Sequence, residues 1–245
     1  MTVIAAASLD EVVGRMRAHE RKMRRRGDPR HAFHGTYLRT ALAVRDALTA
    51  GRFIDPDWVE AWATVFARFY LDALGPRTPD VWATAFRAGP LGPRQRVLLG
   101  MHTHITHDLP LALLEVMDDD DFEDPGVRHR RLRDHVAVDG VLAGRVGPEL
   151  RRVGVRAAPA PEAAARRLRV ARADVWANAE VLARARSHSA AALAAGRQEL
   201  ARLTMRRSEV LASRRWPWAV AVTRAGVRLS PDCLSPVPVS AGVPT

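Results

Sequence analysis

The stretch from Val97 to Met117 is mostly apolar, yet the seven residues from His102 to Asp108 contain three of the chain's nine histidines and a carboxylate. Burying a polar side chain costs free energy unless it is hydrogen-bonded or bound to a ligand, so an apolar helix has no packing reason to collect imidazoles. Imidazole and carboxylate are usual ligands of zinc, iron and manganese. The stretch therefore predicts a buried helix that carries a metal site or an acid–base site.

Apolar residues recur at spacings of three and four along most of the chain, which is the period of an amphipathic helix, and no segment alternates as a strand does. Pro110 lacks a backbone N–H and should kink the central helix near Thr106. We expect an all-α fold, a single-domain helical bundle with a kinked central helix. The expected segments are residues 8–26, 30–50, 56–74, 79–88, 94–117, 127–146, and 162–213 with a break near Gly196.

A chain of 245 residues is long enough to bury one full core. We expect a helical domain over residues 1–225 and a proline-rich, poorly ordered tail over residues 226–245, with a linker at 158–161. The single cysteine, Cys233, excludes a disulfide framework and fits a reducing compartment. The chain shows no signal-peptide pattern and no apolar run of the ~20 residues that span a bilayer, so a cytoplasmic protein without a membrane span is expected.

The net charge of +11 is compatible with binding to nucleic acid. The basic residues are spread along the chain, however, and all but Lys22 are arginines. The one dense cluster, Arg21 to Arg26, is equally well explained as the solvated end of a helix. Nucleic acid is therefore not the expected partner, and a hydrophobic or phosphate-bearing small molecule is preferred.

His104 and Asp108 are four residues apart, so they lie on one face of a helix. His107 lies within reach of the same point, whereas His102 projects toward an apolar side of the helix. We expect His104 and Asp108 to bind a divalent metal, with His107 as a further ligand or general base. His102 is expected in the core, behind the ligands, or among the acid–base groups.

The same His-x-x-x-Asp spacing recurs at His135 and Asp139, on the core side of the helix over 127–146. Two such pairs on separate helices would supply four ligands to a zinc, iron or manganese ion. Asp72 falls on the apolar stripe of the helix over 56–74, where a carboxylate is costly unless it is paired or metal-bound. It is expected to bridge a second ion or to act as a general base.

These patterns also have structural explanations. Buried histidines are often hydrogen-bonded within the core, and His–Asp pairs four residues apart are common on helix surfaces. A buried Asp72 can pair with an arginine. The tryptophans Trp58 and Trp62 are expected in the core rather than on a substrate platform.

The acidic run from Asp118 to Asp124 contains Asp-Asp-x-x-Asp, which matches the magnesium–diphosphate motif of class I terpene synthases. The stretch from His107 to Glu115 partly matches their second metal motif. The order of the two motifs is reversed relative to that family, and their spacing is shorter. Because the run ends in Asp-Pro, it is interpreted as an exposed loop.

Three segments carry a family resemblance: Tyr37-Leu38 with Thr40 and Val44, the stretch from Phe66 to Leu74, and the stretch GMxxHIxHDLPLAL from Gly100 to Leu113. Through them, residues 33–145 resemble a family of bacterial proteins known only as a domain of unknown function. The resemblance implies an all-helical fold and no particular activity. His102 and the acidic run are additions relative to that family.

The pairs His104/Asp108 and His135/Asp139 are also similar to zinc ligands of zinc phospholipase C and P1-type nucleases, which are helical enzymes. That resemblance implies zinc-dependent cleavage of a phosphoester. The chain lacks the amino-terminal tryptophan ligand of those enzymes and has Leu114 where a further histidine is expected, so a three-zinc site is not implied.

The leading hypothesis is a metal-dependent helical enzyme that hydrolyses a phosphoester or related bond. The alternative is a secondary-metabolism cyclase of terpene or polyene type. In that case His102, His104, His107 and Asp108 act as acid–base groups in a hydrophobic helical pocket, or magnesium binds a diphosphate. A third hypothesis is an interaction protein whose histidines form only a polar network in the core.

Overall fold

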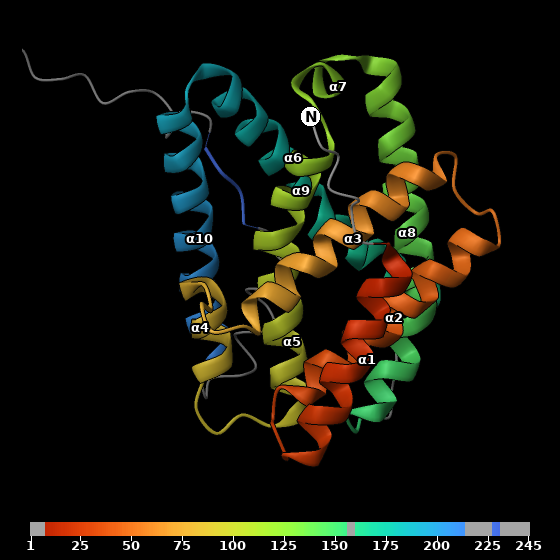
Figure 1. Ribbon diagram of the computed structural model, residues 1–245, viewed down its shortest axis with the longest axis vertical. Helices are drawn as coiled ribbons and strands as arrows, with labels where there is room; N and C mark the ends of the chain where they lie inside the picture. The colour runs from red at the N-terminus through yellow and green to blue at the C-terminus, as the bar shows by residue number, and fades with distance from the viewer. Residues whose placement is uncertain (1–7, 156–159, 214–226, 231–245) are drawn as a thin grey trace, which may run out of the picture.

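The computed structural model describes residues 8–155, 160–213 and 227–230, and every regular element in these ranges is a helix (Figure 1). The predicted all-α, single-domain fold is therefore confirmed. In chain order the elements are α1 (Leu9–Arg25), α2 (His31–Thr49), α3 (Pro56–Ala73), α4 (Asp80–Arg87), α5 (Pro93–Thr103), η1 (His104–Asp108), α6 (Leu109–Val116), α7 (Asp119–Glu123), α8 (Pro125–Arg152), α9 (Pro161–His188) and α10 (Ala190–Ala212).

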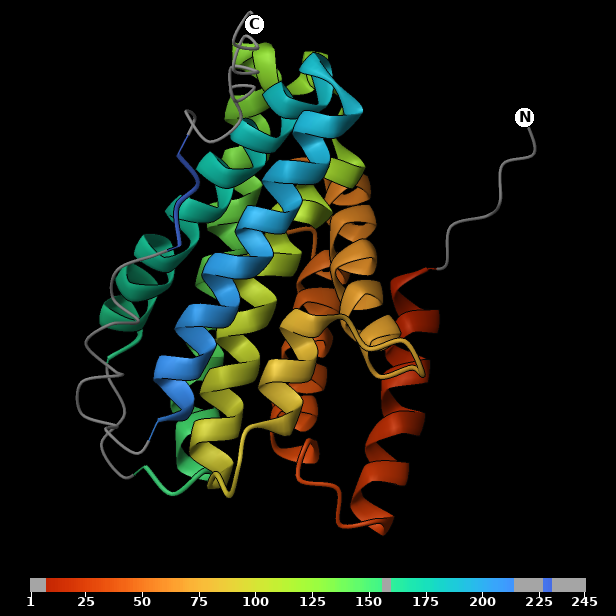
Figure 2. The same ribbon diagram turned by 90° about the vertical axis from the view of Figure 1, so that its left-hand side faces the viewer.

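The central helix consists of three consecutive parts, α5, η1 and α6. Helices α2 and α3 pack against it, as do α4, α9 and α10. In Figure 2, α1 to α3 lie on one side of this central helix and α9 and α10 on the other. The segment with the histidines is therefore surrounded by elements from both ends of the chain.

Local signals in the sequence explain where several helices begin. Ser8 and Glu11 form a capping box at the start of α1. Asp55 accepts a hydrogen bond from the Trp58 N–H at the start of α3, and Asp124 does the same for Val127 at the start of α8. Both of these helices carry proline in the first turn, which favours their start.

The central helix is interrupted where the sequence predicts a kink. Element η1 is a π-helical turn, in which the Leu109 N–H donates to the His104 carbonyl, five residues back. Pro110 follows immediately and has no N–H to donate. The interruption places the histidine segment in a wider turn than an α-helix, a geometry that is frequent at functional sites.

Three predictions about the helices are wrong in detail. The break between the last two long helices lies at Ser189, which caps α10 by accepting from the Ala192 N–H, whereas Gly196 is buried inside α10. Helix α8 continues through Pro148 to Arg152, and its last turn is tied to α2 by the ion pair between Glu149 and Arg39. The acidic run is not a simple loop, because it contains the short helix α7.

The four residues from 227 to 230 pack against α9. Val227 and Leu229 are buried, and the side chain of Asn178 holds both backbones. Its amide donates to the Val227 carbonyl and its Oδ1 accepts from the Leu229 N–H, each at 2.8 Å. The rest of the predicted tail, including Cys233, and residues 158 and 159 of the predicted linker at 158–161 lie outside the described residues.

Among the described residues, no helix combines the length and the apolar composition that crossing a membrane requires.

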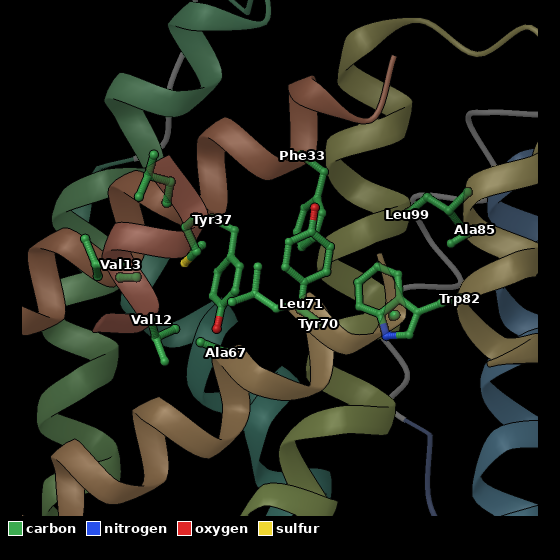
Figure 3. Packing of buried hydrophobic residues seen from close by; sticks show 14 of the residues in the cluster. Val12, Val13, Phe33, Tyr37, Ala67, Tyr70, Leu71, Trp82, Ala85 and Leu99 are labelled. Carbon is green, nitrogen blue, oxygen red and sulfur yellow. The ribbon is translucent and has the colours of Figure 1, made fainter. Parts of the chain in front are cut away.

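The α2–α5 contact depends on a glycine. Figure 3 shows Phe33 of α2 beside Tyr70 and Trp82 in the main apolar cluster. Gly100 of α5 lies so close to the Phe33 ring that a Cβ atom at this position would overlap it. The absence of a side chain at Gly100 therefore allows α2 to approach the central helix.

We expect Gly100→Ala to lower the free energy of unfolding by about 1–3 kcal/mol, because the added methyl group must displace a buried ring. Denaturant unfolding followed by circular dichroism measures this difference. The matched control is Gly140→Ala in α8, where a Cβ would meet no neighbour within 4 Å and helix propensity should leave stability unchanged or raised. Equal midpoints for Gly100→Ala and the parent protein would contradict the close approach.

Candidate functional site

The buried carboxylate of Asp108 accepts hydrogen bonds from three side chains. Its Oδ2 lies 2.8 Å from Nδ1 of His104 and 2.9 Å from Nε1 of Trp82, and its Oδ1 lies 2.7 Å from Nδ1 of His107. Burial alone would raise the pKa of Asp108, but the hydrogen bonds from His104 and His107 outweigh it and leave the pKa below its usual value. Asp108 is therefore an ionised carboxylate inside the core.

The carboxylate of Asp108 determines which ring nitrogen of His104 and of His107 carries a proton. An ionised carboxylate only accepts hydrogen bonds, so His104 and His107 must both donate through Nδ1–H. Burial lowers the pKa of His104 despite the neighbouring Asp108, so its ring is neutral at pH 7. In a neutral ring protonated at Nδ1, Nε2 is a lone-pair acceptor and a base.

Aromatic rings enclose His104. Phe66 of α3 stacks on it with ring centroids 3.6 Å apart and planes inclined by 6°, and Tyr37 of α2 meets it edge-on at 4.4 Å. The Nε2 atom of His104 is buried and has no hydrogen-bond partner in the protein. His104 also lines a cavity of about 60 Å³ whose other walls are almost all apolar, with Arg172 as the one charged member. We call this space the His104 cavity.

His107 has a different environment. Its side chain is 13% exposed and lines an open groove of about 580 Å³ between α4 and α10. The groove also contains the ion pair of Glu199 and Arg202. Asp108 thus connects one imidazole that lines an interior cavity with another that lines a surface groove.

The second predicted pair, His135 and Asp139, is buried in α8 as expected from the sequence. His135 lies between the rings of Trp62 and Trp176, and burial together with Arg172 lowers its pKa well below the usual value. Asp139 forms an ion pair with Arg172, with 2.8 Å between Oδ1 and Nη1. The two residues line a groove of about 380 Å³ along α8 and α9, which shares Arg172 with the His104 cavity.

In the part of the chain that the structure describes, no group of three or more His, Cys, Asp or Glu side chains is arranged to hold a metal ion. The four residues predicted as metal ligands are therefore not gathered around one point. Instead, His104 and Asp108 belong to a His–Asp–His cluster in η1, Asp139 of α8 pairs with Arg172 of α9, and His135 packs against Trp62 and Trp176.

The prediction that Asp72 faces the core is wrong, because Asp72 is exposed near the end of α3. The buried face of α3 includes Trp58, Trp62, Ala67 and Tyr70, whereas the part of the predicted stripe that carries Val65 and Phe69 is only half-buried. A carboxylate at the edge of that stripe therefore points to solvent.

His102 has different neighbours from the two histidines that bind Asp108. It faces α10, where the backbone of Thr204 provides its hydrogen bond, and burial lowers its pKa from 6.5 to about 4. Its Nε2 is buried without a partner in the protein. His102 therefore lies in the α5–α10 interface rather than in the His–Asp–His cluster.

The carboxylates of the Asp-Asp-x-x-Asp motif take part in helix capping. Asp121 accepts from the Asp118 N–H at the start of α7, and Asp124 accepts from the Val127 N–H at the start of α8. In the same run, Asp119 pairs with Arg186 of α9. These contacts give Asp119, Asp121 and Asp124 structural roles.

Two residues of the site were not singled out from the sequence. Trp82 provides the third donor to Asp108, but nothing in its short segment indicates that partner. Arg172 is 3% exposed and precedes the buried residues Val175, Trp176 and Ala179 at helical spacing on α9. The position of Arg172 on this apolar stripe could have identified it from the sequence, because a buried guanidinium requires partners.

The fold and the site define an all-helical protein with an ionised aspartate between two imidazoles in a π-turn. The chain belongs to a family of unknown function (DUF5995), whose model matches residues 9–214. The predicted relation to a domain of unknown function is thus confirmed, and the match extends from α1 to α10. No curated protein and no solved structure matches the chain.

We expect stability to fall as pH decreases from 6.5 toward 4. In this range the unfolded chain protonates His102 while the folded protein does not, so protons favour unfolding. Replacing His102 by Gln should flatten the dependence, by up to a few kcal/mol because one pKa unit corresponds to about 1.4 kcal/mol. Denaturant unfolding at several pH values measures the free energy of unfolding. The control is His188→Gln, which changes an exposed histidine. An unchanged dependence in the His102 variant would contradict this assignment.

Proposed function

We propose that this protein is an acid–base enzyme in which His104, oriented by Asp108, transfers a proton to or from a small, mostly apolar substrate in the His104 cavity. One observation carries the proposal: Nδ1 of His104 is held by an ionised carboxylate, while Nε2 is a buried acceptor without a partner. An unsatisfied buried acceptor costs roughly 1–3 kcal/mol, so its retention favours a role for the free nitrogen.

Asp108 would act on His104 in two ways. Its hydrogen bond fixes the ring orientation and the Nδ1–H tautomer, which directs the basic lone pair to Nε2. When His104 takes up a proton, the adjacent negative charge stabilises the imidazolium. The Trp82 N–H keeps Asp108 ionised and in place throughout.

The aromatic walls would support the same step. The ring of Phe66 lies face to face with His104, and a π-face attracts the positive charge that His104 acquires on protonation. The lining of the cavity is apolar, and a less polar surrounding strengthens the electrostatic interaction between His104 and Asp108. Proton transfer to an apolar substrate is the chemistry that such a cavity favours.

This proposal is related to the cyclase hypothesis, since both use histidine and aspartate as acid–base groups in a hydrophobic helical pocket. The metal-dependent hydrolase, and with it the similarity to zinc phospholipase C and P1-type nucleases, remains a hypothesis. In the observed arrangement the ring nitrogens not bonded to Asp108 belong to residues that line different spaces, the His104 cavity and the α4–α10 groove. One ion bound by both histidines would require the cluster to rearrange.

Deuterium exchange tests the proton transfer directly. The protein is incubated in D₂O with a panel of small apolar carbonyl compounds and alkenes, and deuterium incorporation and product formation are followed by NMR and mass spectrometry. We expect catalysed exchange for at least one compound, and we expect His104→Gln to lower its rate by about 100-fold or more.

Two further variants separate catalysis from folding. Asp108→Asn should also slow exchange, because an amide does not stabilise the imidazolium, whereas the exposed His188→Gln should retain the parent rate. Circular dichroism confirms that each variant is folded. Equal exchange by the parent protein and a folded His104→Gln variant for every compound would refute the proposal.

Metal content distinguishes the two hypotheses. If His104 acts as a base, protein purified without chelator should contain less than one equivalent of zinc, iron or manganese, and His104→Ala should not change that content. Elemental analysis of both samples provides the measurement. About one equivalent in the parent protein that disappears in His104→Ala would favour the metal-dependent hydrolase instead.

A further inference from the structure

A buried arginine at the edge of the His104 cavity has more than half of its N–H donors without an acceptor. Arg172 of α9 is 3% exposed, and its Nη1 pairs with Asp139. Its Nε and Nη2 atoms are buried and have no partner in the protein. These two nitrogens form one edge of the planar guanidinium, and their parallel N–H groups match the two oxygens of a carboxylate.

Two residues that lie near Arg172 also have buried donors without acceptors. Trp62 lies beneath the guanidinium, with 5.4 Å between Cζ and the ring centroid, and its indole N–H is buried and unpartnered. Trp176, which lines the α8–α9 groove with Arg172, also has a buried indole N–H without a partner. Buried donors are normally satisfied, and the four nitrogens of Arg172 and the two tryptophans outnumber the two buried atoms that could accept and that the described part of this region leaves without a hydrogen-bond partner, Asp139 Oδ1 and His135 Nε2. The surplus of donors favours a further acceptor beside Arg172.

The charges in this region favour an anion. Asp139 neutralises one side of Arg172, and Glu180 pairs with Arg128 at the same groove. Arg169 and Arg228 add two further positive charges to the lining of the groove. An anionic ligand therefore approaches Arg172 through a groove with excess positive charge.

Arg172 also connects this groove with the proposed catalytic site. It lines both the α8–α9 groove and the His104 cavity, so a ligand held at Arg172 has an apolar space beside it that contains His104. A ligand held at Arg172 would be the substrate of the proposed enzyme, and this assignment rests on the proposed function.

We infer that Arg172 binds the carboxylate of a small organic acid whose apolar body occupies the His104 cavity. The Nε/Nη2 edge makes two parallel charge-assisted hydrogen bonds to the carboxylate oxygens. A single planar monoanion suits one guanidinium that already shares its charge with Asp139, whereas a phosphate dianion would meet stronger repulsion from that aspartate. The substrate class of the proposed enzyme is then an aliphatic or aromatic monocarboxylic acid.

Isothermal titration calorimetry tests the inference with acetate, butyrate, hexanoate and benzoate as probes, at constant ionic strength. Hexanamide and inorganic phosphate are the uncharged and the alternative anionic controls. We expect at least one carboxylate to bind, and its affinity to exceed that of the amide by about tenfold or more, as charge-assisted hydrogen bonds contribute about 1.5–3 kcal/mol.

Arg172→Lys is the informative variant, because lysine keeps the charge beside Asp139 but lacks the two-pronged edge. Binding should weaken about tenfold or more, while Arg166→Lys, an exposed arginine on the same helix, should bind as the parent does. If the lysine variant does not fold, the double variant Arg172→Gln with Asp139→Asn removes both charges together. Folding of each variant is checked by circular dichroism.

The outcomes separate this inference from the proposed function. Loss of proton exchange in His104→Gln tests the proposed function, whereas loss of carboxylate binding in Arg172→Lys tests this inference, so the two can fail separately. Absence of Arg172-dependent binding for every carboxylate, equal affinity for the amide, or tighter binding of phosphate would each overturn the inference. None of these results bears on the role of His104, which the deuterium-exchange experiment tests separately.

Discussion

The hydrogen bonds to the carboxylate of Asp108 organise the centre of this molecule. An ionised group in an apolar core is strongly unfavourable by itself, and here three N–H donors compensate it. The donors come from α4 and from η1, so the carboxylate links the short helix that carries Trp82 to the π-turn of the central helix. Loss of one donor would leave the buried charge of Asp108 incompletely compensated. The three hydrogen bonds therefore stabilise the cluster together.

Buried polar groups in this fold serve two kinds of purpose. His34 has partners on both ring nitrogens, the Tyr70 hydroxyl at 3.0 Å and the Met16 carbonyl at 2.8 Å. Asp134 similarly accepts from the N–H groups of Ile54 and Asp55 before α3. Such groups are fully explained by packing and capping.

His104 and Arg172 differ from these structural groups. Each uses one part of its side chain to pair with an aspartate and leaves the opposite part buried without a partner. Both line the same apolar cavity, His104 with a neutral imidazole and Arg172 with a guanidinium. Their combination supports the proposed site, which would hold an acid group at Arg172 and move a proton at His104.

Much of the fold follows from local sequence, and the site follows only in part. Helix periodicity, the capping aspartates Asp55 and Asp124, and Pro110 determined the helices and the interruption of the central one, because these effects act within one or two turns. The spacing of His104 and Asp108 likewise determined that they share a face. Only the tertiary structure decided that Trp82 completes the cluster, that Arg172 pairs with Asp139, and that Asp72 faces solvent. Those outcomes depend on how helices distant in sequence rotate and pack against each other, which no local pattern specifies.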